Sequence, residues 1–248
     1  MPENVLSVSH LYKVYPQFAL KDVSFSLGAG KVMGLLGSDG AGKSLLLKCL
    51  VNLSAPDAGE IQFFGLDLRE REASIRQRIG YCGAPGTYYD ALPVWRLISV
   101  TKRFYQTWDN AEYQKFLRIF RIDEQMTLGQ LSRAQRAKLD LAVALAHEAE
   151  LVILDEPTAG LDARSSAELL EVFRELRLRG ISVLFSTRTV SDLERCADDI
   201  LYIKAGEIVA CEALSDFVAY RRVRGFGADL RKIMVHYERG TLDVGSAW

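Results

Sequence analysis

The sequence predicts an α/β fold with a parallel sheet at its centre. Strand-like and helix-like segments alternate along the 248 residues, as they do where helices join parallel strands. The segments 32–36, 151–154 and 181–185 are strand-sized and continuously apolar, which is typical of strands covered on both faces. A glycine-rich turn follows the first of these segments and leads directly into an apolar, helix-like run at 45–50.

The composition is that of an ordinary globular protein. The 31 Lys and Arg residues nearly balance the 32 Asp and Glu residues, so the net charge is −1, and 49% of the residues are hydrophobic. This balance excludes a disordered chain and argues against a general nucleic-acid binder, which usually carries a basic excess. No apolar run approaches the ~18–20 residues that a membrane span needs. The N-terminus also lacks the features of a secretory signal.

The elements before the glycine-rich turn read as strands. Residues 22–27 alternate between polar and apolar, which indicates a half-buried strand. Residues 28–31 then turn the chain into the buried strand 32–36. Near the other end, residues 199–211 read as a hairpin that turns at Ala205-Gly206. We could not assign the tail from Arg221 onward to any element.

Residues 93–149 carry helical periodicity instead. Asp109 and Glu112 have the spacing of a capping box, and an apolar stripe follows at helical spacing, formed by Tyr113, Phe116, Leu117 and Phe120. A second helix is predicted over 134–147. A third is predicted to begin near Ser165 with Glu168 completing a capping box, and to close at Gly180.

A phosphate-binding loop is predicted between the strand 32–36 and the helix that follows it. The sequence fits G-x-x-x-x-G-K-[ST] with Gly37, Ser38, Asp39, Gly40, Ala41, Gly42, Lys43 and Ser44. Backbone N–H groups of such a loop converge on phosphates, and the start of the helix, which includes Leu45, adds a favourable dipole. Lys43 supplies a positive charge, and the hydroxyl of Ser44 can bind Mg²⁺. The pattern therefore predicts β- and γ-phosphates and Mg²⁺ as ligands.

Two acidic residues end the strand 151–154. Asp155 is placed to bind Mg²⁺, and Glu156 is placed to polarise an attacking water. By itself this pair could be an ordinary acidic turn. Together with the phosphate loop it predicts nucleotide hydrolysis, with Glu156 and Lys43 as catalytic residues.

These motifs resemble those of the ATP-binding cassette (ABC) family, and the resemblance covers about residues 4–215. Residues 131–135, Leu-Ser-Arg-Ala-Gln, are similar to the signature Leu-Ser-Gly-Gly-Gln. Residues 159–162, Ala-Gly-Leu-Asp, match the loop that links two protomers, which assigns Asp162 to that loop. Tyr15 matches the aromatic residue that stacks on adenine, although a tyrosine at a strand edge is the alternative. The resemblance implies that the signature residues bind the ATP of a partner cassette, namely Ser132, Arg133, Ala134 and Gln135.

The resemblance also implies an architecture and partners. The expected fold is a RecA-like P-loop NTPase core with a mostly parallel sheet, an antiparallel β subdomain and an inserted helical subdomain. The ATP-binding domain would span 1–215, with its core at 1–92 and 150–215 and its helical subdomain at 93–149, leaving 216–248 as an appendix. The expected partners are a second cassette, identical or different, and a separate integral-membrane permease, with no nucleic acid. The chain would then work in the cytoplasm, peripheral on the inner face of the plasma membrane.

Residues 103–109 point to a narrower group. The run Arg-Phe-Tyr-Gln-Thr-Trp-Asp is similar to the helical subdomain of small bacterial export cassettes, which are linked to antibiotic or peptide efflux. An aromatic core beneath a helix cap is the alternative. Basic residues at 221–224 fit either contact with lipid head groups or permease, or a solvated stretch.

Two family motifs are altered where they bear on chemistry. The glutamine expected after the strand at 79–82 is replaced, since Gly83, Ala84 and Pro85 stand there. The signature carries Arg133 and Ala134 in place of two glycines, which let backbone N–H groups approach a phosphate closely. Arg133 would either contact the partner's ATP or point to solvent.

A third departure is Arg188, which stands where the family has a histidine that contacts the γ-phosphate. Arginine cannot accept a hydrogen bond or relay a proton. Arg188 would therefore either stabilise phosphate charge or simply hold ATP or a carboxylate. We expect an ATP-binding exporter subunit with slow or asymmetric hydrolysis. The alternatives are a nucleotide-dependent regulatory module with little turnover, and a soluble cassette acting in repair or translation.

Overall fold

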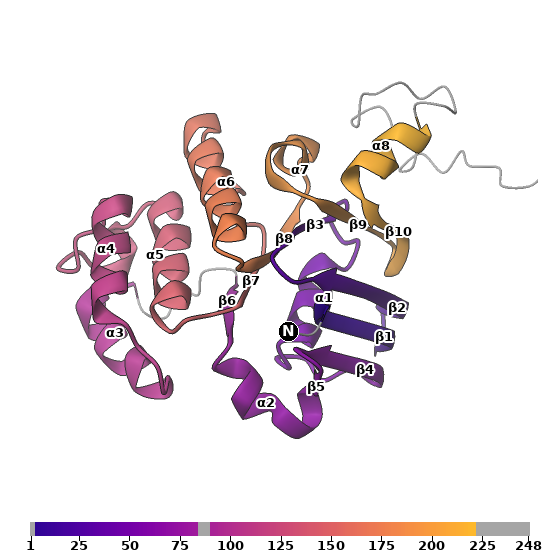
Figure 1. The fold of residues 1–248 in the computed structure, drawn as a ribbon, viewed down its shortest axis with the longest axis horizontal. Coiled ribbons are helices and arrows are strands. Elements are labelled where there is room, and N and C mark those ends of the chain that lie inside the picture. The colour runs from indigo at the N-terminus through magenta and orange to yellow at the C-terminus, as the bar shows by residue number, and fades with distance from the viewer. Residues whose placement is uncertain (1–2, 84–89, 222–248) are drawn as a thin grey trace, which may run out of the picture.

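The computed structural model describes residues 3–83 and 90–221, whose strands form two sheets (Figure 1). The central sheet has the order β10-β9-β3-β8-β7-β6, and all of its neighbouring strands are parallel except the edge pair β9–β10. Its strands are β3 (Val32–Leu36), β6 (Ile79–Cys82), β7 (Leu151–Leu154), β8 (Ser182–Thr187), β9 (Asp199–Lys204) and β10 (Glu207–Ala213).

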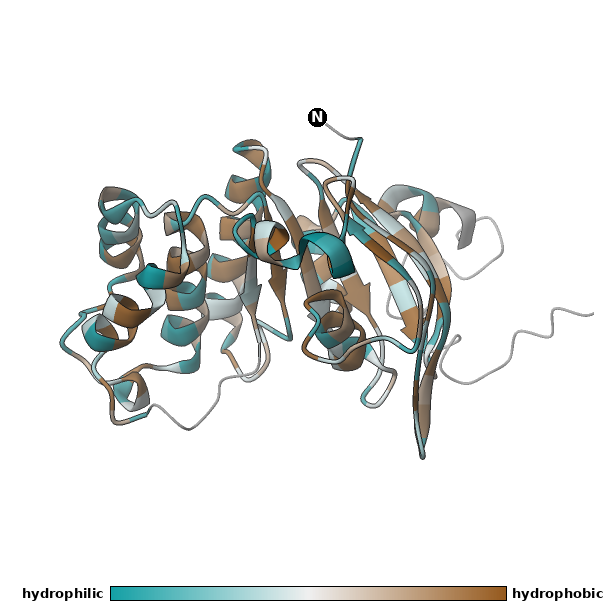
Figure 2. Ribbon diagram, turned by 90° about the horizontal axis from the view of Figure 1, so that it is seen from below, coloured by the Kyte–Doolittle hydropathy of each residue, from teal (hydrophilic) through white to brown (hydrophobic). Residues whose placement is uncertain are grey.

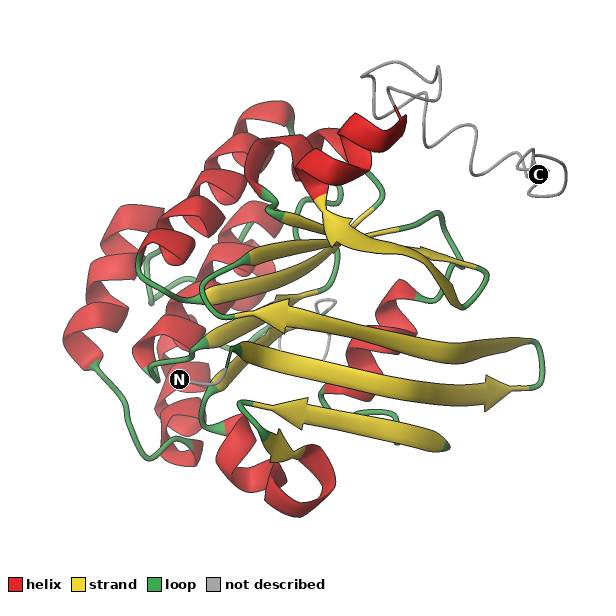
Figure 3. Cartoon of the chain, turned by 45° about the vertical axis from the view of Figure 1, so that its right-hand side comes forward, coloured by secondary structure: helices red, strands yellow, loops and turns green. Residues whose placement is uncertain are grey.

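The second sheet is antiparallel and holds the longest strands, which lie together on one side of the molecule in Figure 3. Its order is β2-β1-β4-β5, formed by β1 (Asn4–Tyr15), β2 (Phe18–Gly28), β4 (Ala58–Phe63) and β5 (Leu66–Asp67). The alternating polar and apolar residues at 22–27 lie within β2, where every second residue is buried, so this sheet has one face on the core and one in solvent.

The helices gather on the opposite side from the antiparallel sheet, except α1, α2 and α8 (Figures 1 and 3). Three helices, α3, α4 and α5, lie between β6 and β7 in the chain and form the helical region predicted from periodicity. The helices are α1 (Lys43–Leu50), α2 (Leu68–Arg76), α3 (Val94–Thr101), α4 (Asn110–Phe120), α5 (Arg133–Ala146), α6 (Ala163–Leu178), α7 (Val190–Cys196) and α8 (Leu214–Arg221). Two short 3₁₀ helices are η1 (Lys102–Phe104) and η2 (Leu128–Gln130).

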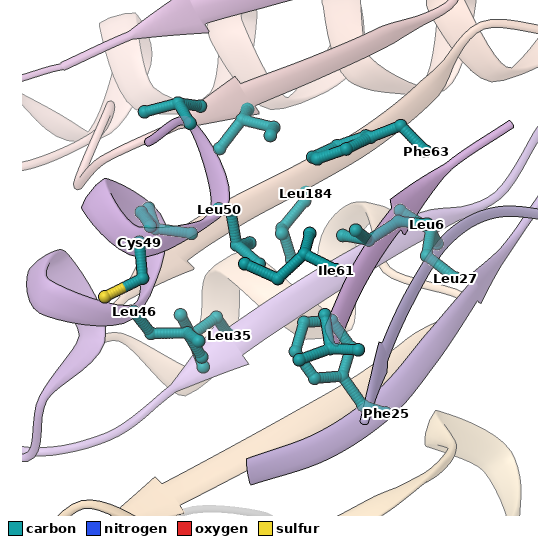
Figure 4. Close-up of a cluster of buried hydrophobic side chains, with 14 of the residues drawn as sticks. Leu6, Phe25, Leu27, Leu35, Leu46, Cys49, Leu50, Ile61, Phe63 and Leu184 are labelled. Carbon is teal, nitrogen blue, oxygen red and sulfur yellow. The ribbon is translucent and has the colours of Figure 1, made fainter. Parts of the chain in front are cut away.

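One hydrophobic core fills the space between the two sheets and surrounds α1. Figure 4 shows side chains from both sheets and from the helix meeting there. Leu6 and Phe63 come from the antiparallel sheet, Leu35 from β3, and Leu46 from α1, and all four are fully buried. This core fixes the start of α1, and so the phosphate loop, against both sheets.

A second core lies on the other face of the central sheet, under α4, α5 and α6. The apolar stripe predicted on α4 is buried there. Figure 2 shows the same pattern as helices brown on one side and teal on the other. The aromatic run at 103–109 is divided: Trp108 packs against this core and Tyr105 stacks on the ring of His147, while Phe104 is exposed.

Most predicted elements are confirmed, within one to four residues at their ends. The hairpin turns at Ala205-Gly206, where both residues have positive φ. The predicted start of α6 at Ser165 is wrong. Asp162 caps this helix by accepting the backbone N–H groups of Arg164 and Ser165, both at 3.0 Å, so helix begins at Ala163.

The expected boundary between domain and appendix at 215/216 falls inside α8. This helix packs on the last hairpin of the central sheet through Phe217, which is fully buried. The first residues of the expected appendix therefore belong to the folded unit. Arg222 and Arg224 lie outside the described residues.

Candidate nucleotide site

The candidate site is built on the loop that joins β3 to α1. Two of its glycines are required by the fold. A Cβ atom on Gly37 would lie 2.6 Å from the carbonyl oxygen of Ile203, and Gly42 has a φ of +109° with Phe18 packed against it. Side chains are excluded at both positions, so the loop backbone stays close to β9 and to the start of β2.

The start of α1 leaves its backbone donors open. Its N-cap, Gly42, has no side chain to accept them. The first intrahelical bond runs from Leu46 N to Gly42 O at 2.9 Å, so the N–H groups of Lys43, Ser44 and Leu45 have no partner within the helix. Such a helix end suits an anion, because its free N–H groups and its dipole both favour negative charge.

Lys43 is nearly fully buried, and its ammonium lies inside the loop. Nζ donates to the carbonyl oxygens of Gly37 at 2.7 Å and Ser38 at 3.0 Å. The same Nζ lies 3.5 Å from a carboxylate oxygen of Glu156. The ammonium is thus held between the loop and the end of β7.

Oxygen atoms that can bind a divalent metal ion lie close together beside Lys43. The hydroxyl of Ser44 donates to Asp155 Oδ1 at 3.1 Å, and the hydroxyl of Ser186 donates to the same atom at 2.7 Å. A hydroxyl and a carboxylate next to a phosphate-type loop are the ligands Mg²⁺ prefers, since Mg²⁺ usually takes one or two protein oxygens and completes its shell with phosphate and water. Ser44 and Asp155 therefore fit the predicted metal.

Glu156 follows Asp155 in a left-handed backbone conformation, with a φ of +47°. Ser186 also accepts the backbone N–H of Glu156 at 2.8 Å, so one serine holds both acidic residues at the end of the sheet. The side chain of Glu156 is 27% exposed and faces Lys43. A carboxylate here could polarise a water that also contacts the loop.

Arg188 joins the loop to this carboxylate. It follows β8, and its guanidinium donates to Asp39 at 2.9 and 3.2 Å, while its Nε lies 3.4 Å from Glu156. Of the alternatives for Arg188, the structure therefore has it paired with carboxylates. Asp39, predicted only as a loop position, is the second partner in this bridge.

A buried aspartate behind the site was not singled out in the sequence. Asp192 on α7 accepts hydrogen bonds from the hydroxyls of Thr158 and Thr187, both at 2.7 Å. Thr158 follows Glu156 in the chain and Thr187 precedes Arg188, so Asp192 fixes the two loops relative to each other. Nothing in a lone Asp-Leu-Glu sequence marks this role, because it also depends on Thr158, which lies 34 residues away in the chain.

Tyr15 lies at the tip of the β1–β2 hairpin. Its ring is about half exposed, its hydroxyl is 3.1 Å from Ser54 Oγ, and Lys13 Nζ lies 5.4 Å from its ring centre. Its register partner across the hairpin is Phe18, the residue that packs against Gly42. The hairpin therefore brings Phe18 to the side of the loop, with Tyr15 as its cross-strand partner, and Phe18 was missed in the sequence.

The signature segment begins α5. Ser132 and Gln135 form a reciprocal capping box, with Gln135 N donating to Ser132 Oγ at 3.2 Å and Ser132 N donating to Gln135 Oε1 at 3.0 Å. Arg133 and Ala134 occupy the first turn of the helix. The guanidinium of Arg133 lies against Gly160 of the 159–162 loop in the same chain, and the residue is exposed to solvent.

The remaining predicted positions are Asp162 in the 159–162 loop and residues 83–85 after β6. Asp162, besides capping α6, accepts the hydroxyl of Ser165 at 2.7 Å, and the backbone and hydroxyl hydrogen bonds from Ser165 lower the pKa of its carboxyl group. Gly83 lines a cavity of about 250 Å³ with Asp155 and Glu156. Ala84 and Pro85 lie outside the described residues.

The structure thus brings together the loop, Asp155, Glu156 and Arg188. Of the four signature residues, only Arg133 lines the cavity that Asp155 and Glu156 also line. The cluster offers free backbone donors and a buried ammonium for phosphate, oxygen ligands for a divalent cation, and a carboxylate for a water. No helix in the described part of the chain is both long and apolar enough to cross a membrane.

Comparison with known proteins agrees with this geometry. The sequence model of the ABC transporter family matches residues 20–159, more than half of the chain. The ABC transporter ATP-binding protein NatA of Bacillus subtilis is 30% identical over 210 residues, which cover 82% of this chain and 85% of NatA. The daunorubicin resistance ATP-binding protein DrrA3 of Streptomyces coeruleorubidus is 32% identical over 216 residues, covering 85% of this chain and 68% of DrrA3.

Solved structures share the fold. The ATP-binding subunit of an ABC transporter superposes with a TM-score of 0.82 at 28% identity, covering 94% of this chain and 98% of that one. A dimeric ATP-binding cassette in a post-hydrolysis state, bound to ADP and Pi, has a TM-score of 0.73 at 21% identity and covers 84% of this chain and 98% of its own. The α/β P-loop NTPase architecture predicted from the sequence is therefore confirmed, and the chain belongs to the ABC transporter family as one of its ATP-binding chains.

Proposed function

We propose that this chain closes as a dimer around Mg-ATP and powers or gates an exporter-type membrane permease, with slow or asymmetric hydrolysis. ATP-binding chains of this family are generally ATPases. The single observation that carries the slow turnover is the contact of Arg188 with both Glu156 and Asp39.

The chemistry assigned to the residues follows from their positions. The N–H groups at the start of α1 and the ammonium of Lys43 would bind and orient the β- and γ-phosphates. Mg²⁺, held by Ser44 and Asp155, would supply charge neutralisation at the phosphate oxygens. Glu156 would orient the attacking water and accept its proton. Tyr15, with Phe18 beside it, would hold the adenine ring by stacking.

Arg188 opposes the role of Glu156 in this scheme. A guanidinium 3.4 Å from the carboxylate engages Glu156 in an ion pair and occupies space that a water would need. The second contact with Asp39 ties the guanidinium to the phosphate loop. Since arginine cannot accept a proton, the water would lose the help that the family histidine gives.

The Arg188→His variant tests this directly. We expect ATP turnover at least about tenfold above that of the unaltered chain, because general acid–base groups typically contribute ~10²–10⁴-fold and Glu156 is released. Steady-state phosphate release over a wide range of protein concentrations is the measurement. Arg188→Gln is the matched control, since it removes the bridge without adding a proton acceptor. Turnover of Arg188→His at or below that of the unaltered chain would contradict the proposal.

The second candidate is a nucleotide-dependent regulatory module with little turnover. The pairing of Arg188 with Glu156 also favours this function, because it engages the carboxylate that hydrolysis requires. The Glu156→Gln variant distinguishes the hydrolase from the regulatory module. A loss of phosphate release in this variant supports a hydrolase, whereas unchanged release with ATP-induced dimerisation supports the module.

We assign permease binding to an apolar groove of about 510 Å³ between the core and the helical region. Its walls come from the segment after α1, from α2 and β6, and from η1, and its lining includes Leu53, Tyr81 and Phe104. Leu53 and Phe104 are 60% and 73% exposed, so the groove presents large apolar side chains that a partner could cover. Burial raises the pKa of Tyr81 to about 12, so its hydroxyl stays neutral beside this groove.

The export direction rests on similarity. A relative at 31% identity, from Burkholderia lata, is a Nod factor export ATP-binding protein, and DrrA3 is a daunorubicin resistance protein. We therefore assign this chain to an exporter and place it peripherally on the inner face of the plasma membrane, beside its permease. The dimeric post-hydrolysis cassette supports closure of two cassettes around nucleotide. Asp162 and the signature residues would lie at that contact.

A further inference from the structure

One surface of the helical region combines basic and aromatic side chains. The outward face of α3 and η1 exposes Trp95, Arg96, Val100, Lys102 and Arg103, whereas Val94 and Ile98 point into the core. The spacing explains this division, because residues three, four and seven positions apart share one face of a helix. Phe104 continues the surface and is 73% exposed. We call these six exposed residues the α3–η1 face.

The cations of this face are not neutralised by the chain itself. Within residues 3–83 and 90–221, no ion pair involves Arg96, Lys102 or Arg103. The backbone N–H of Trp95 donates to the carbonyl oxygen of Glu124, whose carboxylate accepts a hydrogen bond from Gln114. The face is therefore locally positive, although the whole chain has a net charge of −1.

We propose that the α3–η1 face rests on an anionic lipid surface. Lipid head groups attract lysine and arginine, whose long side chains reach the charged layer, while tryptophan favours the boundary between head groups and acyl chains. Basic and aromatic residues on one exposed helix face are the pattern of an interfacial contact. The groove beside the α3–η1 face, which Phe104 also lines, favours a protein partner, whereas the face itself favours lipid.

The position of the face fits a supporting contact. In Figure 1, α3 lies at the outer edge of the helical region, away from the central sheet. Because Phe104 belongs to both surfaces, a permease held in the groove would stand next to lipid that the face could touch. The contact is expected to orient the chain at the membrane and requires no ATP turnover.

Vesicle binding tests the proposal without the permease. The probes are vesicles containing phosphatidylglycerol and phosphatidylcholine, and vesicles of phosphatidylcholine alone, at low and high salt. The variant Arg96→Gln/Lys102→Gln/Arg103→Gln removes the cations, and Arg71→Gln/Arg118→Gln/Arg164→Gln removes three exposed arginines elsewhere. All proteins keep the C-terminal arginines, so a difference between the variants reports on the face alone. Far-UV circular dichroism checks that both variants are folded.

The expected result is binding to the anionic vesicles that weakens with salt. Each surface cation contributes about fivefold to such binding, so the face variant is expected to lose on the order of a hundredfold while the control variant loses far less. Trp95 emission is expected to shift to shorter wavelength on binding, and Trp95→Phe removes that shift. No binding, equal binding to neutral vesicles, or equal losses in the two variants would overturn the proposal. These results do not depend on nucleotide, so they leave the proposed ATP chemistry untouched.

Discussion

Lys43→Ala is expected to weaken ATP binding by about a hundredfold or more. The ammonium lies inside the loop, where it donates to two carbonyl oxygens and sits 3.5 Å from Glu156. Charged hydrogen bonds contribute about 1.5–3 kcal/mol each, and a phosphate would receive more than one. Removing the amine also removes the positive charge beside Glu156, so the carboxylate would repel the phosphates more strongly. Titration calorimetry with Mg-ATP measures the loss.

Lys48→Ala is the matched control for this measurement. Lys48 lies on the same helix, but its side chain is exposed and in the last turn, away from the loop. Its removal changes the net charge by the same amount and is expected to leave ATP affinity within about twofold, because exposed charges at this distance are screened. Equal losses in the two variants would show that the loop ammonium has no special role in binding.

Phe63→Ala is expected to lower the free energy of unfolding by about 3–5 kcal/mol. Phe63 is fully buried between the two sheets, next to Leu6 in the register of β1 and β4 (Figure 4). The substitution leaves a cavity that two sheets and α1 cannot close without moving the phosphate loop. The urea midpoint, followed by circular dichroism, reports the change in stability.

Phe104→Ala provides the comparison for this second prediction. It deletes the same side chain from an exposed site, so we expect a change within about 0.5 kcal/mol. If Phe63→Ala also stayed within that range, the space between the sheets would not be the close-packed core that the structure describes. ATP affinity measured on Phe63→Ala is expected to fall as well, because that core holds the start of α1.

Local patterns predicted the regular elements well. The continuous apolar runs became β3, β7 and β8, and the stripe on α4 is buried, because alternation and helical spacing express which face meets the core. The prediction for the start of α6 was wrong for an equally local reason. Both Asp162 and Ser165 are residue types that cap helices well, and the structure selects Asp162 because its carboxylate reaches two backbone N–H groups.

The candidate site was predicted unevenly. The sequence predicted Lys43, Ser44, Asp155 and Glu156 as site residues, and the structure brings them together at one end of the parallel sheet, where strands β3 and β7 both end. It did not identify Ser186, which accepts the N–H of Glu156 and donates to Asp155. A serine inside a buried strand carries no pattern of its own.

What the sequence by itself determined is the fold class, the family, and the residue types available for phosphate and metal. These depend on short-range spacing, where neighbouring residues carry the information. Only the tertiary structure decided what Arg188, Arg133 and Asp192 do. Each is a lone polar residue whose effect depends on at least one partner far away in the chain: Asp39 and Glu156 for Arg188, Gly160 for Arg133, and Thr158 for Asp192. Charges and hydrogen bonds act over a few ångströms, and only the packing of the two sheets and the helices sets those distances.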